Sequence, residues 1–181
     1  MRLRLKIAAA IAATALCAGV PGGVADAHAG VLGGDSAACL GGGGPAIRVN
    51  VDGLKDRIGE LKLELYPATD ADFLKDDRDL IKEGKVFRRV QVPTPATGSV
   101  ALCIKAPTPG TYALLFTHNR DGKNKFNFWA DGAGFPSNAR LGRARPKLTM
   151  ATITVPNGLV TTDIHAQYLR GLGGFAPIKG S

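Results

Sequence analysis

The stretch "SVALCIKAPTPGTYALLFTH", residues 99–118, decides the fold. In its first half Val100, Leu102 and Ile104 recur at every second position, so they share one face of an extended segment. A Pro-Gly turn at 109–110 then reverses the chain. The second half is apolar on both faces, which predicts a strand at the centre of a sheet.

Alternation of apolar and polar residues recurs on both sides of this stretch, which predicts an all-β fold. The expected strands are residues 47–51, 61–65, 85–92, 99–106, 112–116, 147–155 and 158–168. The first two are apolar on one face only, as in an antiparallel sheet that meets water on its other side. Turn residues 156–158 predict a hairpin between the last two strands. We therefore expect an antiparallel β-sandwich of about seven strands with one short helix, at residues 46–168.

The segment that breaks the alternation is "PATDADFLKDDRDLI", residues 67–81. Thr69 or Asp70 is a suitable N-cap for a short helix, because its side-chain oxygen can accept from an unpaired backbone amide. Phe73 and Leu74 are expected to hold this helix against the sheet. The many aspartates of the segment suggest either a cation site or a solvated helix surface. We favour the solvated surface, because acids in a first turn interact favourably with the helix dipole.

The first 27 residues are typical of an export signal, with three basic residues, an apolar stretch at 7–20 and "ADA" before the cut. A membrane anchor is the alternative, but about 14 apolar residues are fewer than the roughly 20 that span a bilayer. A lipoprotein is a second alternative, and neither Cys17 nor Cys39 stands where lipidation requires it. We expect cleavage after Ala27, a periplasmic or extracellular protein, and no membrane-spanning segment after processing.

Two flanking segments are expected to lie outside the sandwich. Residues 28–45 are mostly Gly and Ala, which is typical of a flexible lead-in, and residues 169–181 form a Gly-rich C-terminal tail that we expect to be loose. Cys39 is the reason to expect that part of the lead-in is held. It makes an even pair with Cys103 in the exported chain, and an oxidising compartment favours a disulfide over two free thiols.

Charge and motifs restrict the function. The formal net charge of +8 becomes about +6 once the signal is removed, an excess that suits anionic envelope polymers and does not indicate nucleic-acid binding. No "GxSxG" elbow, "HExxH" pair or Gly-rich phosphate loop occurs in the sequence. We therefore expect no enzyme, no catalytic residue and no cofactor.

A set of motifs between residues 46 and 167 resembles a known bacterial family. "VNVDGL" and "LKLELY" mark the first two strands, and "PGTYALLFTH" is followed, after a loop rich in Gly, Asn and Asp, by "GFPSNAR". This combination is similar to the exported family catalogued as domain of unknown function 2141. The resemblance implies an exported sandwich, transthyretin-like or immunoglobulin-like, with no assigned activity.

The loop that follows His118 bears on metal binding. The resemblance implies a run similar to a calcium loop, with an Asp directly after the histidine, whereas Asn119 stands there. Between residues 118 and 128 only Asp121 is anionic, and three basic residues oppose a divalent cation. We expect no metal, and we interpret the loop as a cover whose aromatic residues at 126–135 pack over the end of the sandwich.

Five residues are candidates for ligand contacts, namely His118, Trp129, Arg140, Arg143 and Arg145. The histidine ends a strand beside the long loop, the tryptophan is either core cover or a stacking platform, and arginines hold phosphate or carboxylate bidentately. They favour a binding or adhesion module of the cell envelope for an anionic glycan or lipid headgroup. The alternatives are a structural accessory domain with an envelope protein as partner, and a calcium-dependent module.

Overall fold

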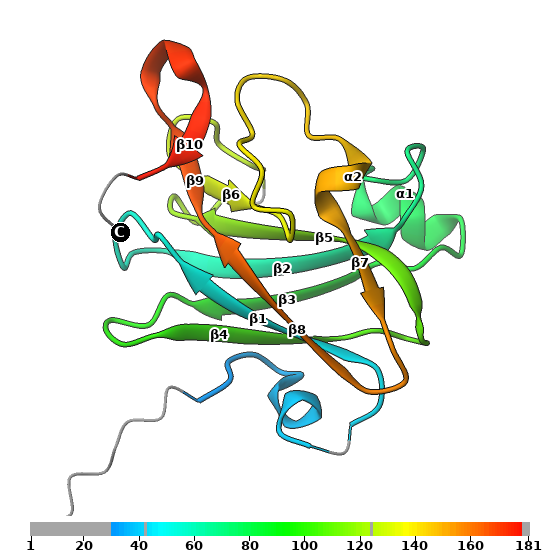
Figure 1. Ribbon diagram of the computed structural model, residues 1–181. Coiled ribbons are helices and arrows are strands. Elements are labelled where there is room, and N and C mark those ends of the chain that lie inside the picture. The colour runs from blue at the N-terminus through cyan, green and yellow to red at the C-terminus, as the bar shows by residue number, and fades with distance from the viewer. Residues whose placement is uncertain (1–29, 42, 124, 179–181) are drawn as a thin grey trace, which may run out of the picture.

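The computed structural model describes residues 30–41, 43–123 and 125–178, and the predicted signal peptide lies outside them. Within these residues ten strands form two sheets that enclose one hydrophobic core (Figure 1). The elements are η1 (Ser36–Cys39), β1 (Ala46–Asp52), β2 (Glu60–Pro67), α1 (Asp77–Lys82), β3 (Arg88–Pro93), β4 (Val100–Lys105), β5 (Gly110–Asn119), β6 (Gly132–Gly134), α2 (Leu148–Ala151), β7 (Thr152–Val155), β8 (Leu159–His165), β9 (Gln167–Leu169), η2 (Gly171–Gly173) and β10 (Phe175–Pro177). The predicted β-sandwich is confirmed, with ten strands in place of about seven.

The first sheet has the strand order β4-β1-β8, and the second has the order β10-β9-β6-β5-β2-β3. All pairs are antiparallel except β1 with β8, which are parallel. β5 pairs with β2 along one edge, and with both β6 and β7 along the other. The strand that was expected at the centre of a sheet is therefore confirmed as central.

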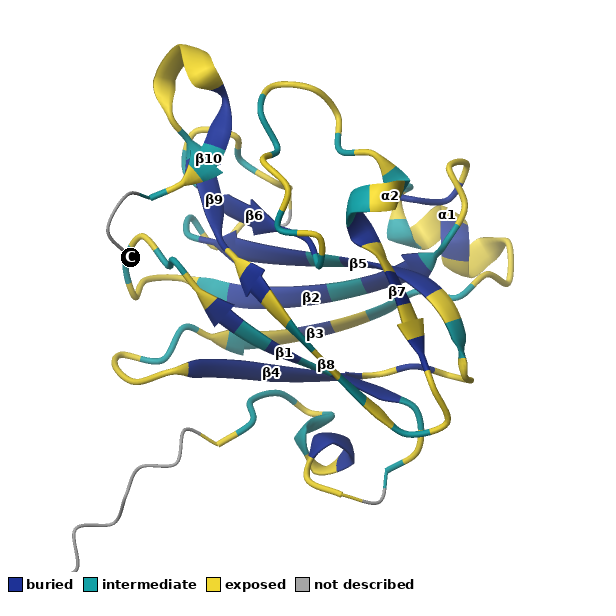
Figure 2. Cartoon of the chain, viewed as in Figure 1, coloured by how far each residue is buried: buried dark blue, intermediate teal, exposed yellow. Residues whose placement is uncertain are grey.

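Aliphatic side chains at every second position build the core. Leu61, Leu63 and Leu65 of β2 are fully buried, and they share one cluster with Leu102 and Ile104 of β4. Each such side chain contributes roughly 1.5–3 kcal/mol of burial free energy. In Figure 2 β4 is dark blue along its length, because its residues from 100 to 104 are buried on both faces.

The chain changes sheets twice after residue 152. β7 pairs with β5 in the second sheet and β8 pairs with β1 in the first, so the predicted hairpin at residues 156–158 is wrong. The predicted strand 158–168 is also divided, because β8 and β9 join different sheets on either side of Ala166. A turn motif indicates a local reversal, whereas the pairing partner of a strand depends on residues far away in the chain.

The short helix forms later in the aspartate-rich segment than predicted. α1 begins after Asp76, whose carboxylate accepts a hydrogen bond from the backbone N–H of Arg78. Thr69, the predicted cap, forms a local turn in which its hydroxyl hydrogen-bonds the carboxylate of Asp72 at 2.8 Å. The positive φ of 61° at Leu74 separates this turn from the helix. No helix among the described residues is long and apolar enough to cross a membrane.

The segment before β1 is packed, so the prediction of a flexible lead-in is wrong for residues 31–41. Leu32 forms a parallel bridge with Leu102, donating its N–H to Ala101 at 2.7 Å and accepting from Cys103 at 3.1 Å. η1 follows and contacts both β1 and β4. The segment thus extends the first sheet by one bridge and then covers its outer face.

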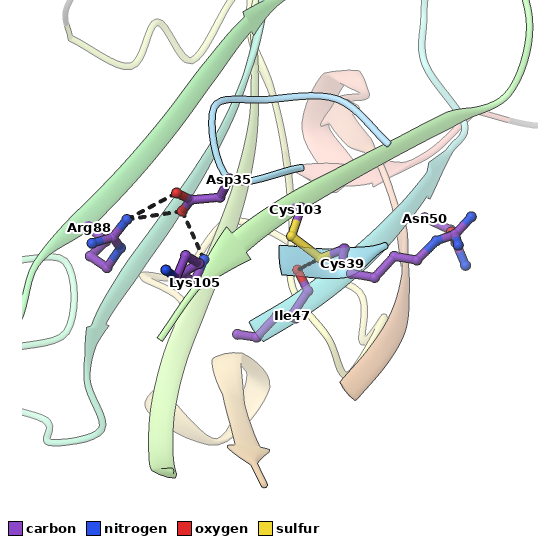
Figure 3. Close-up of a disulfide and its surroundings, with 8 residues drawn as sticks. Asp35, Cys39, Ile47, Asn50, Arg88, Cys103 and Lys105 are labelled. Carbon is purple, nitrogen blue, oxygen red and sulfur yellow. Dashed lines mark hydrogen bonds and ion pairs between the residues drawn. A yellow bond between two sulfur atoms is a disulfide. The ribbon is translucent and has the colours of Figure 1, made fainter. Parts of the chain in front are cut away.

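A disulfide fastens this cover, as predicted. The sulfurs of Cys39 and Cys103 are bonded, with 6.0 Å between the two Cα atoms, and they join η1 to β4 (Figure 3). Asp35 strengthens the attachment, because its carboxylate accepts from the side chain of Arg88 at 3.0 Å and from the backbone N–H of Lys105 at 2.9 Å (Figure 3).

The C-terminal tail is also ordered structure where it is described, and the expectation of a loose tail at 169–181 is wrong for residues up to 178. β10 pairs with β9, and Phe175 at its start is 6% exposed. Gly174 adopts a φ of 74° and approaches Gly142, which lets the backbone of Phe175 exchange two hydrogen bonds with Gly142.

Candidate ligand groove on the outer face of the second sheet

The second sheet carries an open groove on the face that points away from the core. Because side chains alternate along a strand, residues 62, 64 and 66 of β2 and residues 115, 117 and 119 of β5 lie on this outer face. The groove has a volume of about 550 Å³. This volume lies within the range of roughly 300–1,000 Å³ that is usual for small-molecule pockets.

Most of the groove surface is apolar, and four of its six charged residues are cationic. The apolar lining comprises Tyr66, Leu74, Leu115, Phe126, Phe128, Trp129, Ala133, Phe135, Leu141, Gly142, Ala144, Pro146, Leu169 and Phe175. The polar lining comprises Lys62, Glu64, Thr117, Asn119, Lys123, Lys125, Asp131 and Arg143. An apolar cavity with a few placed polar groups is the usual form of a binding site for a small organic ligand.

One wall is the long loop, described at residues 120–123 and 125–131, which is organised by its own Asn and Asp side chains. The buried carboxylate of Asp131 accepts from the backbone N–H groups of Arg120 and Asn127, each at 2.8 Å. The side chain of Asn127 donates to Asp121 at 2.8 Å and accepts from the backbone N–H of Trp129 at 3.1 Å. These bonds close local turns, as Asn and Asp side chains commonly do in loops.

The arrangement of this loop bears on the calcium-dependent alternative. The hydrogen bond from Asn127 and the bond from the backbone N–H of Lys123 hold the pKa of Asp121 below its usual range. Arg120 occupies the base of the loop, where it pairs with Asp56 and donates to the carbonyl of Ala130 at 2.8 Å. Within the described part of the chain no group of three or more His, Cys, Asp and Glu residues is arranged to hold a metal ion.

Aromatic rings fix the long loop to the tail and leave its tip in solvent. Phe126 and Phe128 pack edge-on at 5.2 Å, and both contact the buried ring of Phe175 at about 6 Å. Trp129 is 84% exposed and Phe128 is 64% exposed. The interpretation of these rings as a cover over the core is therefore wrong for Phe128 and Trp129, whereas Phe135 is buried against Phe73 as expected.

The opposite wall, residues 139–146, is held by the C-terminal strands. Gln167 is fully buried, and its side chain donates to the carbonyl of Ala139 at 2.9 Å and accepts from the N–H of Leu141 at 3.0 Å. The bridge between Gly142 and Phe175 continues this attachment. Because Phe175 also contacts the aromatic rings of the long loop, β10 connects the two walls.

The two carboxylates that line the groove are engaged within the protein. Glu64 accepts from the hydroxyl of Tyr66 at 2.7 Å and pairs with Arg89 at 2.6 Å. Asp131 is held by the backbone amides of the long loop. By contrast Lys62, on the groove floor, is 8% exposed and has neither a hydrogen-bond acceptor nor an ion-pair partner among the described residues. The electrostatic character of the groove is therefore positive.

His118 does not contribute to this groove. Its ring is fully buried and donates from Nε2 to the carbonyl of Ile58 at 2.8 Å, while Nδ1 accepts from the hydroxyl of Tyr168 at 2.6 Å. The Tyr168 oxygen accepts in turn from the N–H of Lys55 at 3.0 Å. Burial lowers the pKa of His118 below its ordinary value of 6.5 and raises that of Tyr168 to about 12.

The other residues that sequence motifs singled out do not form one cluster. Arg143 and Trp129 line the groove, but Arg140 donates to the carbonyl of Gly173 at 3.1 Å. Arg145 donates to the carbonyl of Phe73 at 3.0 Å and borders a separate, smaller hollow beside α2. Sequence reasoning missed Lys62, because polar residues that alternate along a strand usually face water and give no signal of burial. It assigned Asn119 to the loop, whereas β5 extends to that residue.

Comparison with known proteins identifies a family and leaves the activity open. Residues 49–163 match the model of a family described as uncharacterized protein conserved in bacteria (DUF2141), which confirms the resemblance seen in the motifs. The match covers more than half of the chain. No curated protein matches the sequence. No solved structure matches it either.

Proposed function

We propose that this chain, which belongs to the DUF2141 family of uncharacterized bacterial proteins, is an exported, non-catalytic binding module of the cell envelope whose groove takes a small amphiphile. The observation that carries the proposal is the groove on the second sheet, with an apolar lining and a positive floor. An apolar lining matches the hydrocarbon part of an amphiphile, and burial of apolar area drives such binding.

The aromatic wall supports binding because it is held in place before a ligand arrives. Hydrogen bonds of Asp131 and Asn127 order the long loop, and Phe175 holds Phe126 and Phe128. A wall that is already ordered loses little conformational entropy on binding. A lipid tail fits this lining better than the anionic glycan that the sequence also suggested, because four leucines contribute to it.

Export is part of the proposal and is supported by the bond between Cys39 and Cys103, because structural disulfides form mainly in oxidising compartments. Mass spectrometry of the protein recovered from the periplasm or medium tests it. A mature chain that begins at His28 is expected. A full-length chain retained in the cytoplasm with free thiols contradicts export.

Trp129 is the only tryptophan of the chain and lines the groove, so its fluorescence reports on occupancy. Titration of the purified protein with decanoate below its micelle concentration is expected to shift the emission to shorter wavelength and to saturate. Phe128→Ser is expected to weaken this binding about tenfold, since an aromatic contact of this kind contributes roughly 0.5–1.5 kcal/mol beyond its buried area.

Leu172→Ser provides the matched control, because Leu172 is 87% exposed on η2 and does not line the groove. It is expected to bind like the wild type. Equal weakening in both variants, or a lack of any saturable shift, contradicts a groove that binds amphiphiles. If no saturable shift is found, recovery of an envelope protein whose binding depends on Trp129 would support the accessory-domain alternative. The exposure of the Trp129 ring favours that alternative.

A further inference from the structure

Lys62 is the most unusual side chain of the groove. It lies on the outer face of β2, it is 8% exposed, and no residue in the described ranges accepts a hydrogen bond from its ammonium or pairs with it. Its aliphatic stem is buried while its ammonium still reaches the open groove, and a lysine that is buried to this extent is normally paired. An unpartnered charge in a cavity therefore indicates a group that is completed by something other than the chain.

Neighbouring carboxylates do not complete it, because each is held elsewhere. Glu64, two residues along β2, is bound by Tyr66 and Arg89. Glu60, two residues before, accepts from Gln91 at 2.7 Å and from the side-chain amide of Asn119 at 3.3 Å. The two acids that precede and follow Lys62 on this face of β2 thus already have donors of their own.

Asn119 supplies a second unsatisfied group, of the opposite kind. Its side chain is buried, and its Oδ1 has no hydrogen-bond partner, whereas its Nδ2 donates to Glu60. The orientation of the amide follows from this bond, because an ionised carboxylate accepts and cannot donate. Oδ1 is therefore a buried acceptor that needs a donor.

The register of the sheet puts the two groups on the same floor. Lys62 of β2 pairs with Thr117 of β5, and Glu60 pairs with Asn119. Lys62 and Asn119 are therefore diagonal neighbours on one face, a relation that corresponds to roughly 7–8 Å in an antiparallel pair. Both residues line the groove. Oδ1 itself is covered, so a ligand donor reaches it by displacing the groups that now lie over it.

We propose that the groove selects a single-chain amphiphile whose head carries an anionic oxygen and, beside it, a hydroxyl or amide hydrogen. This inference rests on the proposed binding function and specifies its ligand. The anionic oxygen accepts from Lys62, and the neighbouring donor satisfies Oδ1 of Asn119. The hydrocarbon chain lies against Leu115, Phe126 and Phe135. A hydroxy fatty acid has this chemistry, and a neutral or cationic amphiphile does not.

Four probes with the same chain length separate the requirements, namely 3-hydroxydecanoate, decanoate, 1-decanol and decyltrimethylammonium. Binding to the wild-type protein is followed at neutral pH by Trp129 fluorescence and by calorimetry. The expected order of affinity is 3-hydroxydecanoate, then decanoate, then the alcohol, with the cation weakest. At least a tenfold difference is expected between decanoate and the alcohol, because a hydrogen bond to a buried charged group is strong.

Two variants assign these preferences to their residues. Lys62→Met keeps most of the side-chain stem, and it is expected to remove the preference for decanoate over 1-decanol without lowering the thermal midpoint. Asn119→Ala is expected to remove the preference for 3-hydroxydecanoate over decanoate, and Asn119→Thr serves if the alanine variant does not fold. Lys82→Met is the matched control, because it removes an equal charge from an exposed position at the end of α1 that does not line the groove. It is expected to change every affinity less than threefold.

The outcomes separate this inference from the function on which it rests. If no probe binds, the amphiphile-binding function fails together with the inference. If all four bind to the wild-type protein with similar affinity, the function stands and selection by Lys62 is excluded. A retained preference for decanoate in Lys62→Met, or an equal loss in Lys82→Met, also overturns the proposal. Unfolding of Lys62→Met would indicate that Lys62 has a structural role. The order in which the four probes bind to the wild-type protein would then decide whether the proposal holds.

Discussion

The outer faces of the two sheets differ in how they are covered. On the first sheet the segment before β1 bridges to β4, and the disulfide between Cys39 and Cys103 holds η1 against that strand. On the second sheet two loops stand along the sides of the outer face, and an apolar groove of about 550 Å³ remains between them. One face is closed by a covalent link, and the other is left accessible.

Side-chain size explains the difference. Ala38 of η1 and Ala46 of β1 belong to the small cluster under the cover, and Gly43 comes so close to Ala38 that an added Cβ would lie 2.4 Å away. Small residues allow η1 to pack on β1 and β4, and allow the turn after η1 to fold back closely on η1. On the second sheet the outer face carries Lys62 and Leu115, and longer side chains hold a covering loop at a distance.

The largest expected effect is on the closed face. Replacing both Cys39 and Cys103 by Ala removes a link across 64 residues, which is worth about 4 kcal/mol on the chain-entropy model. Thermal or denaturant unfolding measures the loss. Decanoate binding is expected to stay as in the wild type, because the groove lies on the other sheet. A weakened affinity at temperatures where the variant is folded would mean that the two faces are coupled.

On the open face the largest effect is expected at Phe175, which connects the two walls. Phe175→Ala removes a ring that is 6% exposed and contacts Phe126 and Phe128, so a loss of about 3 kcal/mol is expected. Here, in contrast to the cysteine variant, decanoate affinity should fall as well, since both walls lose their common support. Unfolding curves and the fluorescence titration are compared on the same sample. Unchanged binding would show that the walls are independent.

Acidification is expected to have a smaller effect on stability, and this effect arises in the core and not on either outer face. The folded-state pKa of His118 is lowered from 6.5 by burial, so the unfolded chain binds a proton that the folded protein excludes. Its contribution to stability is therefore complete above pH 6.5 and is lost as the pH falls towards the folded-state pKa, at up to about 1.4 kcal/mol per pH unit.

Denaturant unfolding at pH 7.5 and pH 5.5 measures this dependence. His118→Gln is expected to reduce it, and its overall stability is expected to be lower because two buried hydrogen bonds change. The carboxylate of Asp56, whose pKa is lowered by Arg120, adds a loss only below about pH 3.8. An equal slope between pH 7.5 and 5.5 in the variant would assign the effect to other groups.

The smallest effect on stability is expected at Trp129. Its ring is 84% exposed, so Trp129→Phe should change the free energy of unfolding by less than about 0.5 kcal/mol. Decanoate binding, now followed by calorimetry, should weaken only slightly because an aromatic ring remains. A large destabilisation would mean that the ring covers the core, as the sequence suggested, and would remove the contrast between the closed and the open face.

The parts of the fold that were predicted correctly are those that a local pattern or the composition of the chain indicates. Alternation in β2 and β4 indicated strands and buried faces, and an even pair of cysteines indicated the disulfide. The cap of α1 was misplaced, because Thr69, Asp70 and Asp76 all have suitable side chains and only the packing of Leu80 selects among the possible starts.

The candidate site was predicted only in part. Arg143 and Trp129 line the groove, but His118 is buried in the core, although it ends a strand beside the loop as expected. The residues that give the groove its charge, Lys62 above all, look like ordinary solvated strand positions in the sequence. Burial of such a residue depends on which loop lies over it, and that loop begins almost sixty residues later.

Taken alone, the sequence determined that this chain forms a β-sandwich with one disulfide and a central strand, because side-chain alternation and cysteine pairing are properties of short segments and of composition. Only the tertiary structure decided that β8 runs parallel to β1, that the segment before β1 closes one face, and that Lys62 and Asn119 share a groove floor. The physical reason is that strand partners and loop positions depend on contacts between distant residues, whose energies no local pattern encodes.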